Sequence, residues 1–446
     1  MSSELKNKNV SVEVAKALEK SNTISKTFCH FPFTTSFIGS GGIAIPCCVS
    51  ELANHPDSNK ELQLPRKSFD DYWNSKVLAK VRQELLEGKK PISCRRCWVD
   101  EAQGMTSKRI DDATKIERAS LEDLSVEEFK EKIIKKPKLL WLDLQMANLC
   151  NLGCRMCTPW NSSIIEDEAI AHAEEFKNQK MLKKRILDPL PYVAKETAWW
   201  KDSGFRKELE KLIPQLRAIT VSGGEPTVNK YFNDIIDFCI KEGYAKDLIL
   251  KFNTNGMQIN RKYMDKLTPF YKIEMKVSVD AVGPLYGYIR WKGDWKTLEK
   301  NMFLFKEYRS SRFKVVSDPT YMVLNILNMV DLLQWHLDND MWWYNLNPVH
   351  LPKYHNITCL PMQVRELAYN RLSKFLQTNK SAFDDQQRTS ITNILLHLET
   401  DDTKFQKEIL PVFFEHTRIL DKLRGQSFSK LAPELYNLLH KIPLTI

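Results

Sequence analysis

From Leu139 onward, short apolar segments alternate with amphipathic helical stretches along the chain. This alternation favours a parallel sheet covered by helices, because parallel neighbours need a crossover long enough to form a helix. The expected strands are 139–144, 218–222, 248–253, 274–279, 314–321 and 342–346. Six strands of this kind predict an α/β fold, a partial (β/α)6 barrel of the TIM type.

The segments before and after this region lack its alternation of strands and helices. We expect a polar tail over 1–25, a separate N-terminal domain over 26–110 and a charged, helix-prone linker over 111–137. The barrel is expected over 138–355 and a helical extension over 356–446. Further expectations are a hairpin at 26–50 that turns on its glycines, a helix at 68–88 and a charged helical insertion at 161–210.

Composition excludes several classes of protein. A hydrophobic content of 43% with 10% aromatic residues excludes wholesale disorder in this 446-residue chain. No apolar run approaches the ~18–20 residues of a membrane span, and the polar N-terminus does not resemble a signal peptide. We therefore expect a cytoplasmic protein without membrane contact. The net charge of +10 is spread along the chain, and no nucleic-acid-binding motif is present.

The ten cysteines are strongly clustered, and only Cys239 and Cys359 stand alone in apolar surroundings, as inert thiols. In a reducing compartment, clustered cysteines favour metal or iron–sulfur binding over disulfides. Cys150, Cys154 and Cys157 follow the first barrel strand with the spacing C-x3-C-x2-C. Three thiolates on one loop can hold three corners of a cuboidal cluster and leave one iron open. Zinc stays an alternative, although structural zinc sites usually close with four ligands.

A second motif, Thr-Val-Ser-Gly-Gly-Glu-Pro at 220–226, ends the second strand. Gly223 and Gly224 let backbone groups approach a ligand closely, so we expect a side chain at Gly224 to push that ligand away. Taken alone, the motif is an ordinary strand-to-helix turn.

Together, the cysteine loop and this turn resemble the radical S-adenosylmethionine (SAM) superfamily over roughly 139–348. The resemblance implies a 4Fe–4S cluster on Cys150, Cys154 and Cys157, with the methionine end of SAM chelating the open iron. It also implies the residues that contact SAM: Met156, Gly223, Gly224, Glu225, Ser278 and Arg290. Met156 stands where the family usually has an aromatic residue.

Four N-terminal cysteines form a second set. Cys29 and Cys47 occur in a C-x12-G-x4-C pattern, and Cys94 and Cys97 form a C-x2-C pair. The set resembles the twitch domain, a short relative of the SPASM domain, and implies a second, fully ligated 4Fe–4S cluster. In the family this module usually follows the barrel, whereas here it precedes it. Cys48 is the alternative to Cys47 as a ligand, and a structural zinc knuckle is the alternative to the cluster.

The resemblance implies an enzyme of oxidoreductase, transferase or peptide-modifying type. It would cleave SAM reductively to a 5′-deoxyadenosyl radical that takes hydrogen from a peptide, protein or small-molecule substrate. Its electrons would come from a donor such as flavodoxin or ferredoxin. No pattern identifies the substrate or an acid–base pair. The rival interpretation is a non-catalytic zinc protein with structural cysteine sites and an anionic partner.

Overall fold

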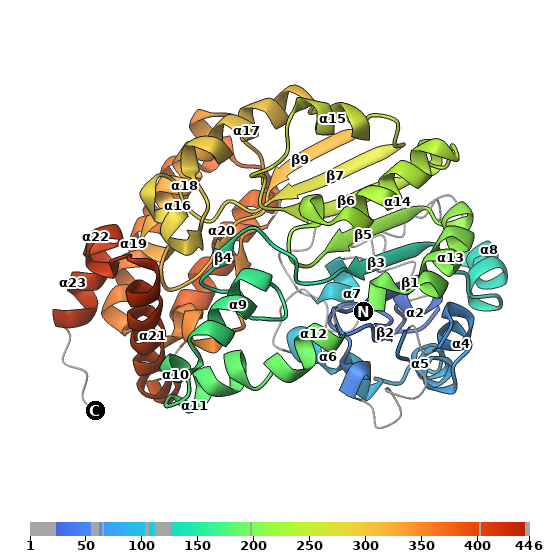
Figure 1. Ribbon diagram of the computed structural model, residues 1–446, viewed down its shortest axis with the longest axis horizontal. Helices are drawn as coiled ribbons and strands as arrows, with labels where there is room; N and C mark the ends of the chain where they lie inside the picture. The colour runs from blue at the N-terminus through green and yellow to red at the C-terminus, as the bar shows by residue number, and fades with distance from the viewer. Residues whose placement is uncertain are drawn as a thin grey trace, which may run out of the picture.

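A curved sheet lies at the centre of the computed structural model, and helices run along its outer side (Figure 1). The structure describes residues 24–54, 62–64, 67–102, 107–111, 126–196, 199–343, 345–400 and 403–441. Nearly all of the expected polar tail, 1–25, and much of the expected linker, 111–137, lie outside these ranges.

The central sheet has seven strands in the described residues, in the order β2-β1-β3-β5-β6-β7-β9. The strands are β1 (Thr35–Ile38), β2 (Ala44–Ile45), β3 (Trp141–Gln145), β5 (Ala218–Ser222), β6 (Ile249–Thr254), β7 (Lys272–Val277) and β9 (Phe313–Ser317). All neighbours are parallel except β2, which is antiparallel to β1. This arrangement confirms the α/β partial barrel.

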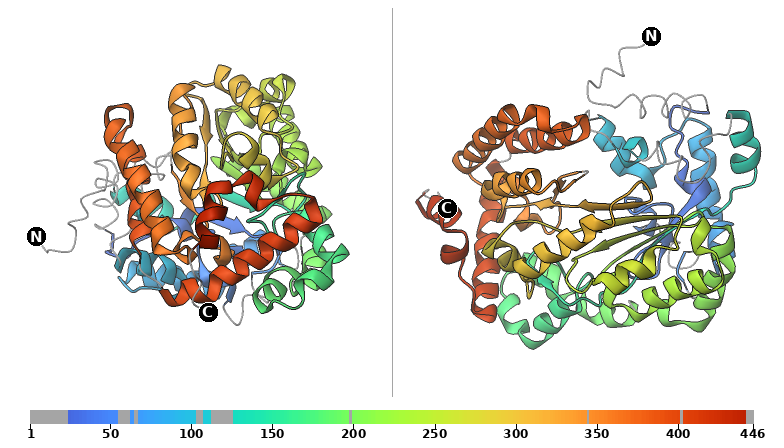
Figure 2. Two further views of the ribbon diagram at one scale, coloured as in Figure 1. Left: turned by 90° about the vertical axis from the view of Figure 1, so that its left-hand side faces the viewer. Right: turned by 90° about the horizontal axis from the view of Figure 1, so that it is seen from above.

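Alternation along each strand separates the two faces of the sheet. On β3, Leu142 and Leu144 are fully buried in the core, whereas Trp141, Asp143 and Gln145 are half-buried on the opposite face. Successive side chains of a strand point to opposite faces, so the leucines face the outer helices. The polar side chains therefore face the concave side of the sheet, whose curvature Figure 2 shows.

Helices that lie between strands in the sequence cover the outer side of the barrel (Figure 1), and four long ones follow β5. They are α14 (Lys230–Lys241), α15 (Arg261–Leu267), α17 (Trp295–Glu307) and α18 (Met329–Asp338). The first three begin after Asn229, Asn260 and Asp294, whose side chains accept a backbone N–H of the first turn. A shorter helix, α16 (Pro284–Ile289), lies in the loop after β7.

The described residues 342, 343, 345 and 346 form no strand, which corrects the prediction of a sixth barrel strand at 342–346. Only an isolated bridge joins Ser317 to Trp343. The N–H of Leu346 donates to Ser390 Oγ at 2.6 Å instead of to the sheet, and Pro348 has no N–H to donate. What remains is a two-residue pairing of β10 (Thr320–Tyr321) with β11 (Asn347–Pro348). On the opposite edge, the hairpin strand β1 pairs in parallel with β3 and becomes the sixth parallel strand.

The N-terminal region forms the predicted hairpin, β1–β2, and a set of short helices. These are α2 (Phe31–Thr34), α4 (Phe69–Trp73), α5 (Lys76–Leu86), α6 (Arg95–Ala102), α7 (Lys108–Asp111) and α8 (Val126–Phe129). The single helix predicted over 68–88 is two helices, because Ser75 caps a new one by accepting the N–H of Leu78. The described end of the predicted linker is packed, since Phe129 and Ile133 are buried against Phe28.

Helices also make up the insertion and the C-terminal region, as predicted. The insertion contains α9 (Ser163–Ala171), α10 (Ala173–Phe176), α11 (Lys180–Leu182), α12 (Leu190–Glu196) and α13 (Ser203–Leu212). The C-terminal helices are α19 (Met362–Thr378), α20 (Asp385–Glu399), α21 (Thr403–Arg424), α22 (Phe428–Leu431) and α23 (Pro433–Lys441). One hydrophobic core runs from Ile38 of the hairpin to Leu439 of α23 and unites all three regions.

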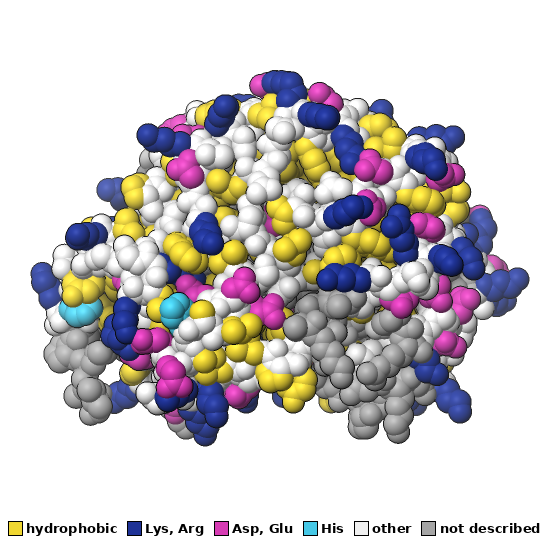
Figure 3. Space-filling model, in the orientation of Figure 1, with side chains coloured by type: hydrophobic (Ala, Val, Ile, Leu, Met, Phe, Trp, Pro, Cys, Tyr) yellow, Lys and Arg dark blue, Asp and Glu magenta, His cyan; other side chains and the backbone are white. Residues whose placement is uncertain are grey.

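The surface matches the even charge distribution of the sequence. Basic and acidic side chains are interspersed over the face shown in Figure 3. Within the described ranges, no helix combines the length and the apolar character that crossing a bilayer requires.

Candidate active site

The loop after β3 carries the first cysteine set, and two consecutive serines hold it to α9. Ser163 donates its N–H to Asn148 O at 2.6 Å, and its hydroxyl accepts the N–H of Cys150 at 3.2 Å. Ser162 Oγ donates to Leu152 O at 2.8 Å. These contacts order the loop between the first and second cysteines at the C-terminal edge of the sheet, where parallel α/β folds place their sites.

Cys154 lies deepest of the three cysteines. It forms the strand β4 (Gly153–Cys154), which pairs with β8 (Arg290–Trp291). Arg290 Nη1 donates to Cys154 Sγ at 3.6 Å, and Arg290 Nε donates to Asp280 Oδ2 at 2.7 Å. A hydrogen bond from Cys157 and then the charge of Arg290 lower the pKa of the Cys154 thiol, while the same hydrogen bond raises the pKa of Cys157. The environment thus stabilises a thiolate, the form that binds iron.

Gly223 and Gly224 both adopt positive φ, at 87° and 53°. A Cβ atom on Gly224 would lie 2.2 Å from Leu149 O, and one on Gly223 would lie 2.8 Å from Gln145 Cγ. The close approach at Gly224 is therefore to the backbone of the cysteine loop. This contact alone excludes a side chain at Gly224, and the expected contact of Gly224 with SAM stays a prediction.

Glu225 is buried, with 1% exposure, and its carboxylate is used within the protein. Oε1 accepts from Thr227 Oγ1 and Thr254 Oγ1, each at 2.7 Å, and Oε2 accepts the N–H of Asn255 at 2.6 Å. Burial raises the pKa of this carboxyl, and the hydrogen bonds oppose that rise. Glu225 therefore joins the loops after β5 and β6, and these donors occupy both of its oxygens.

Further hydrogen bonds connect the ends of neighbouring strands to the cysteine loop. Asn255 Nδ2 donates to Asn151 Oδ1 at 2.7 Å, and Glu225 N donates to Leu149 O at 2.8 Å. Ser278, just after β7, donates its N–H to Thr254 O at 2.9 Å. Of the other SAM-contact candidates, Met156 is half-buried against the core and Arg290 faces Cys154. The structure thus brings this predicted set to one edge of the barrel.

The second cysteine set lines a single cavity in the N-terminal region. Cys29, Cys47, Cys94 and Cys97 all face it, whereas Cys48 is exposed and absent from its lining. The empty volume is about 360 Å³, part of it open to solvent. Among the described residues, no three His, Cys, Asp or Glu side chains converge as tightly as one metal ion requires. The four thiols therefore surround a shared space and do not meet at a point.

Burial governs the thiols of this cavity. It raises the pKa of Cys29 to about 12 and that of Cys94 to about 11, so neither is a thiolate on its own at neutral pH. Lys108 and Arg109 also line the cavity. These two cations would offset the charge of a thiolate-ligated cluster, so the residues present fit such a group.

The concave face holds a carboxyl group that the sequence patterns did not single out. Asp143 lies in register with Thr220 of β5, followed by Lys251 of β6 and Glu274 of β7. Lys251 pairs with Glu274 at 3.2 Å, but Asp143 accepts no hydrogen bond from any described residue. Burial raises the pKa of Asp143 to about 6 against the lowering effect of Lys108 and Lys251. Lys108 also lines the four-cysteine cavity, so one residue of that cavity acts electrostatically on Asp143.

The signal that could have revealed Asp143 is a charged residue between two apolar residues in the middle of a strand. Lys251 and Glu274 show the same pattern on β6 and β7. In a strand with one face in the core, such a residue must face the interior of the barrel.

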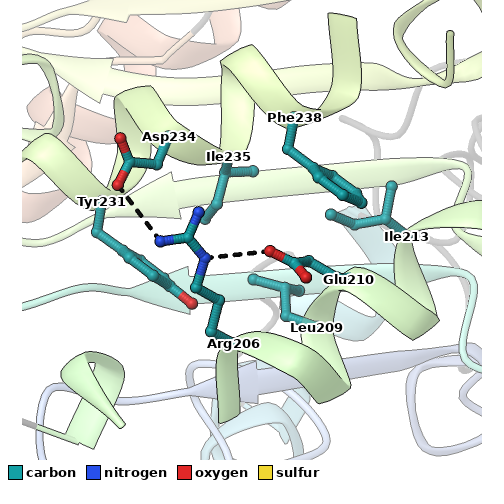
Figure 4. Close-up of a pocket in the computed structure, with 8 residues that line it drawn as sticks. All are labelled: Arg206, Leu209, Glu210, Ile213, Tyr231, Asp234, Ile235 and Phe238. Carbon is teal, nitrogen blue, oxygen red and sulfur yellow. Dashed lines mark hydrogen bonds and ion pairs between the residues drawn. The ribbon is translucent and has the colours of Figure 1, made fainter. Parts of the chain in front are cut away.

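Another pocket lies outside the barrel, between α13 and α14 (Figure 4). Arg206 at its centre pairs with Glu210 at 3.1 Å and with Asp234 at 3.7 Å. The charged groups of this pocket therefore pair with one another. Neither cysteine set lines the pocket.

Comparison with known families agrees with these two sites. The radical SAM superfamily model matches residues 144–334, and the SPASM iron–sulfur cluster-binding domain model matches residues 29–98. The chain thus carries a radical SAM domain over 144–334 and an N-terminal SPASM-type domain over 29–98. The cofactors of such a chain are a 4Fe–4S cluster with SAM and an auxiliary iron–sulfur cluster.

Two solved structures of low sequence identity are similar to part of this chain. anSMEcpe with bound AdoMet is 14% identical, with a TM-score of 0.36 over 54% of this chain and 61% of that chain. Streptococcus suis SuiB bound to S-adenosylmethionine is 11% identical, with a TM-score of 0.33 over 68% of this chain and 59% of that chain. The chain thus spans about three-fifths of the length of these proteins. No curated protein matches it.

Proposed function

We propose that the chain is a radical SAM enzyme that removes a hydrogen atom from a peptide or protein side chain. Cys150, Cys154 and Cys157 hold the SAM-binding 4Fe–4S cluster in this proposal. Cys29, Cys47, Cys94 and Cys97 hold the auxiliary cluster. A one-electron donor of the flavodoxin or ferredoxin type supplies the reducing equivalent in the cytoplasm.

One observation carries the proposal: the three-cysteine loop has no fourth thiol. All ten cysteines lie in the described part of the chain, and the other seven are elsewhere. Four line the N-terminal cavity, Cys48 is exposed, and Cys239 and Cys359 are buried in the core. A cuboidal cluster on this loop would keep one iron without a protein ligand, and that iron is available to SAM.

The chain's own residues position and insulate the site. When bound, the cluster and SAM together supply a 5′-deoxyadenosyl radical that takes hydrogen from the substrate. Arg290 places a positive charge against Cys154, which favours the thiolate and offsets the negative charge of the site. Gly224 allows the turn after β5 to close against the cysteine loop, and Glu225 ties that turn to β6. This packing excludes water from one side of the site.

The auxiliary site lies close enough to the concave face to share a residue with it. Lys108 lines the four-cysteine cavity and also acts on Asp143. Four thiolates would complete the coordination of a cluster there, so this cluster would not bind SAM. We propose that it exchanges electrons with the substrate or stiffens this side of the barrel.

The test is a variant with Cys150, Cys154 and Cys157 all changed to Ala, purified and reconstituted without oxygen. Wild type should carry about eight irons per chain, and the variant about half of them, in the auxiliary site. The variant should form no 5′-deoxyadenosine from SAM and a reductant. Undiminished 5′-deoxyadenosine would overturn the proposal. Colourless wild-type protein with zinc would support the rival zinc-binding function.

A second measurement addresses the substrate. Candidate peptides are incubated with the reconstituted enzyme, SAM and a reductant, and their masses are compared with those from the triple variant. A mass change that depends on the three cysteines identifies a peptide substrate, whereas its absence from every peptide favours a small molecule.

A further inference from the structure

Arg155 lies inside the C-x3-C-x2-C motif, yet its side chain points away from the thiols. It is 1% exposed, and its Nε donates to Tyr288 O at 2.8 Å. Its Nη2 donates to Asp421 Oδ1 at 2.5 Å and to Gln426 Oε1 at 2.9 Å. Asp421 belongs to α21, so the turn between the second and third cysteines is tied to a C-terminal helix.

Asp421 is the centre of this contact. Its Oδ1 also accepts from Tyr288 Oη at 3.0 Å, and its Oδ2 accepts the N–H of Phe428 at 2.6 Å. The guanidinium of Arg155 lies 3.8 Å from the centre of the Tyr288 ring. One carboxylate therefore joins the cysteine loop, the segment before β8, α21 and the start of α22.

A second contact reaches the loop on its other side. Arg424, at the end of α21, donates two hydrogen bonds to Glu168 of α9, at 2.8 and 2.7 Å. Its guanidinium lies 4.6 Å from the centre of the Trp291 ring. Trp291 pairs with Gly153, where a Cβ atom would lie 2.8 Å from the Trp291 ring. Trp291 thus packs against the backbone next to Cys154, and Arg424 packs on the ring of Trp291.

Both ion pairs are charged at both ends and have a buried arginine, and Asp421 is 17% exposed. The side chains of Arg155 and Arg424 have no exposed surface, and Glu168 is 8% exposed. Removing one partner of such a pair leaves the other charge buried without compensation. Loss of one partner would therefore displace the cysteine loop, whereas loss of a surface ion pair would not.

We infer that α21 holds the SAM-cluster loop in position, with Asp421 and Arg424 as positioning residues for Cys154 and Cys157. The C-terminal helices are then part of the catalytic unit, although the radical SAM family match ends at residue 334. Metal sites depend in this way on the groups that orient their ligands, and losing such a group often costs about tenfold or more in metal affinity. The inference rests on the proposed function, because it concerns the same cluster.

The experiment compares Asp421→Asn with Glu415→Gln in the full-length, anaerobically reconstituted protein. Glu415 is a matched control, since it also lies on α21 but pairs only with Arg418 at the surface. Each protein is incubated with an iron chelator, and electron paramagnetic resonance follows the two cluster signals separately. We expect Asp421→Asn to lose the SAM-cluster signal about tenfold faster than wild type, with the auxiliary signal unchanged. Glu415→Gln should behave as wild type.

Gln426→Leu is the milder second variant, because it removes one acceptor from Arg155 and leaves the ion pair in place. It should accelerate loss of the same cluster, by a smaller factor, and keeps the test decisive if Asp421→Asn does not fold. Equal loss of both clusters in Gln426→Leu, or no acceleration in either variant, would overturn the inference. A wild-type protein without a SAM-cleaving cluster would instead overturn the proposed function, so the two failures are distinguishable.

Discussion

At the scale of single residues, the close contacts around Gly224 explain why a glycine stands there. The positive φ and the carbonyl of Leu149, 2.2 Å from a Cβ position, both exclude a side chain. We expect Gly224→Ala to displace the cysteine loop, and so to lose the SAM-cluster signal as well as SAM cleavage. The measurement is iron content together with 5′-deoxyadenosine formation.

Gly243→Ala is the control for this variant. Gly243 also has positive φ, at 76°, but no atom lies within 4 Å of its Cβ position. It should cost about 1 kcal/mol of stability from backbone strain alone and retain both clusters. If Gly224→Ala kept its SAM cluster and lost only affinity for SAM, the ligand itself would be what requires the glycine.

Asp143 gives a prediction that depends on pH. Burial raises its pKa from 3.8 to about 6, so the folded state binds this proton more tightly than the unfolded chain does. The resulting cost is absent below pH 4, grows between pH 4 and 6, and is fully present above pH 6. Asp143→Asn should therefore raise the free energy of unfolding by about 1–3 kcal/mol at pH 8, and by less at pH 5. Denaturant unfolding of both proteins at the two pH values measures it.

If Asp143→Asn raised the free energy of unfolding equally at both pH values, ionisation of Asp143 would not be the cause of the lower stability. Thr220→Val is a suitable comparison, because Thr220 lies beside Asp143 on the same face and does not ionise. A carboxyl group kept in the chain at a cost to stability is typical of functional sites.

At the scale of elements, the hairpin β1–β2 and the turn before α6 together build the auxiliary site. Cys47 follows β2 and faces the cavity, whereas Cys48 is exposed. We expect Cys94→Ala to lose the auxiliary cluster and to keep the SAM cluster. The N-terminal region should also become less stable, because part of the energy of metal binding is folding energy. Iron counting and limited proteolysis measure the two effects.

Cys48→Ala is the internal control, and it should match wild type in iron content and in both cluster signals. If Cys48→Ala lost the auxiliary cluster while Cys47→Ala kept it, the ligand assignment would be reversed. Loss of zinc in place of iron from Cys94→Ala would indicate a structural zinc knuckle.

The elements also show where sequence patterns fail. Strand and helix periodicity predicted β3, β5, β6, β7 and β9 within a few residues, since each has one face in the core. The segment at 342–346 has the same apolar character, but Leu346 gives its N–H to Ser390 of α20. Whether Leu346 donates its N–H to the sheet or to Ser390 depends on a helix more than 40 residues away in the sequence. No local pattern can predict this.

At the scale of the whole molecule, the N-terminal region and the barrel share one sheet. The pairing of β1 with β3 runs over four residue pairs, from Thr35–Trp141 to Ile38–Leu144. This pairing explains how a module that precedes the barrel in sequence comes to lie beside its concave face. The helices α21, α22 and α23 lie at the opposite end of the molecule (Figure 1), and Asp421 of α21 contacts Arg155 of the cysteine loop directly.

The sequence by itself determined the features that depend on neighbours along the chain. The three-cysteine spacing, the glycine turn and the strand–helix alternation all lie within short segments, where spacing and periodicity dictate geometry. Only the tertiary structure decided that Cys29, Cys47, Cys94 and Cys97 share one cavity, and that Arg155 meets Asp421 across 266 residues. Contacts of that range follow from burying one common core and pairing charges such as that of Arg155 inside it, and both conditions involve the whole chain at once.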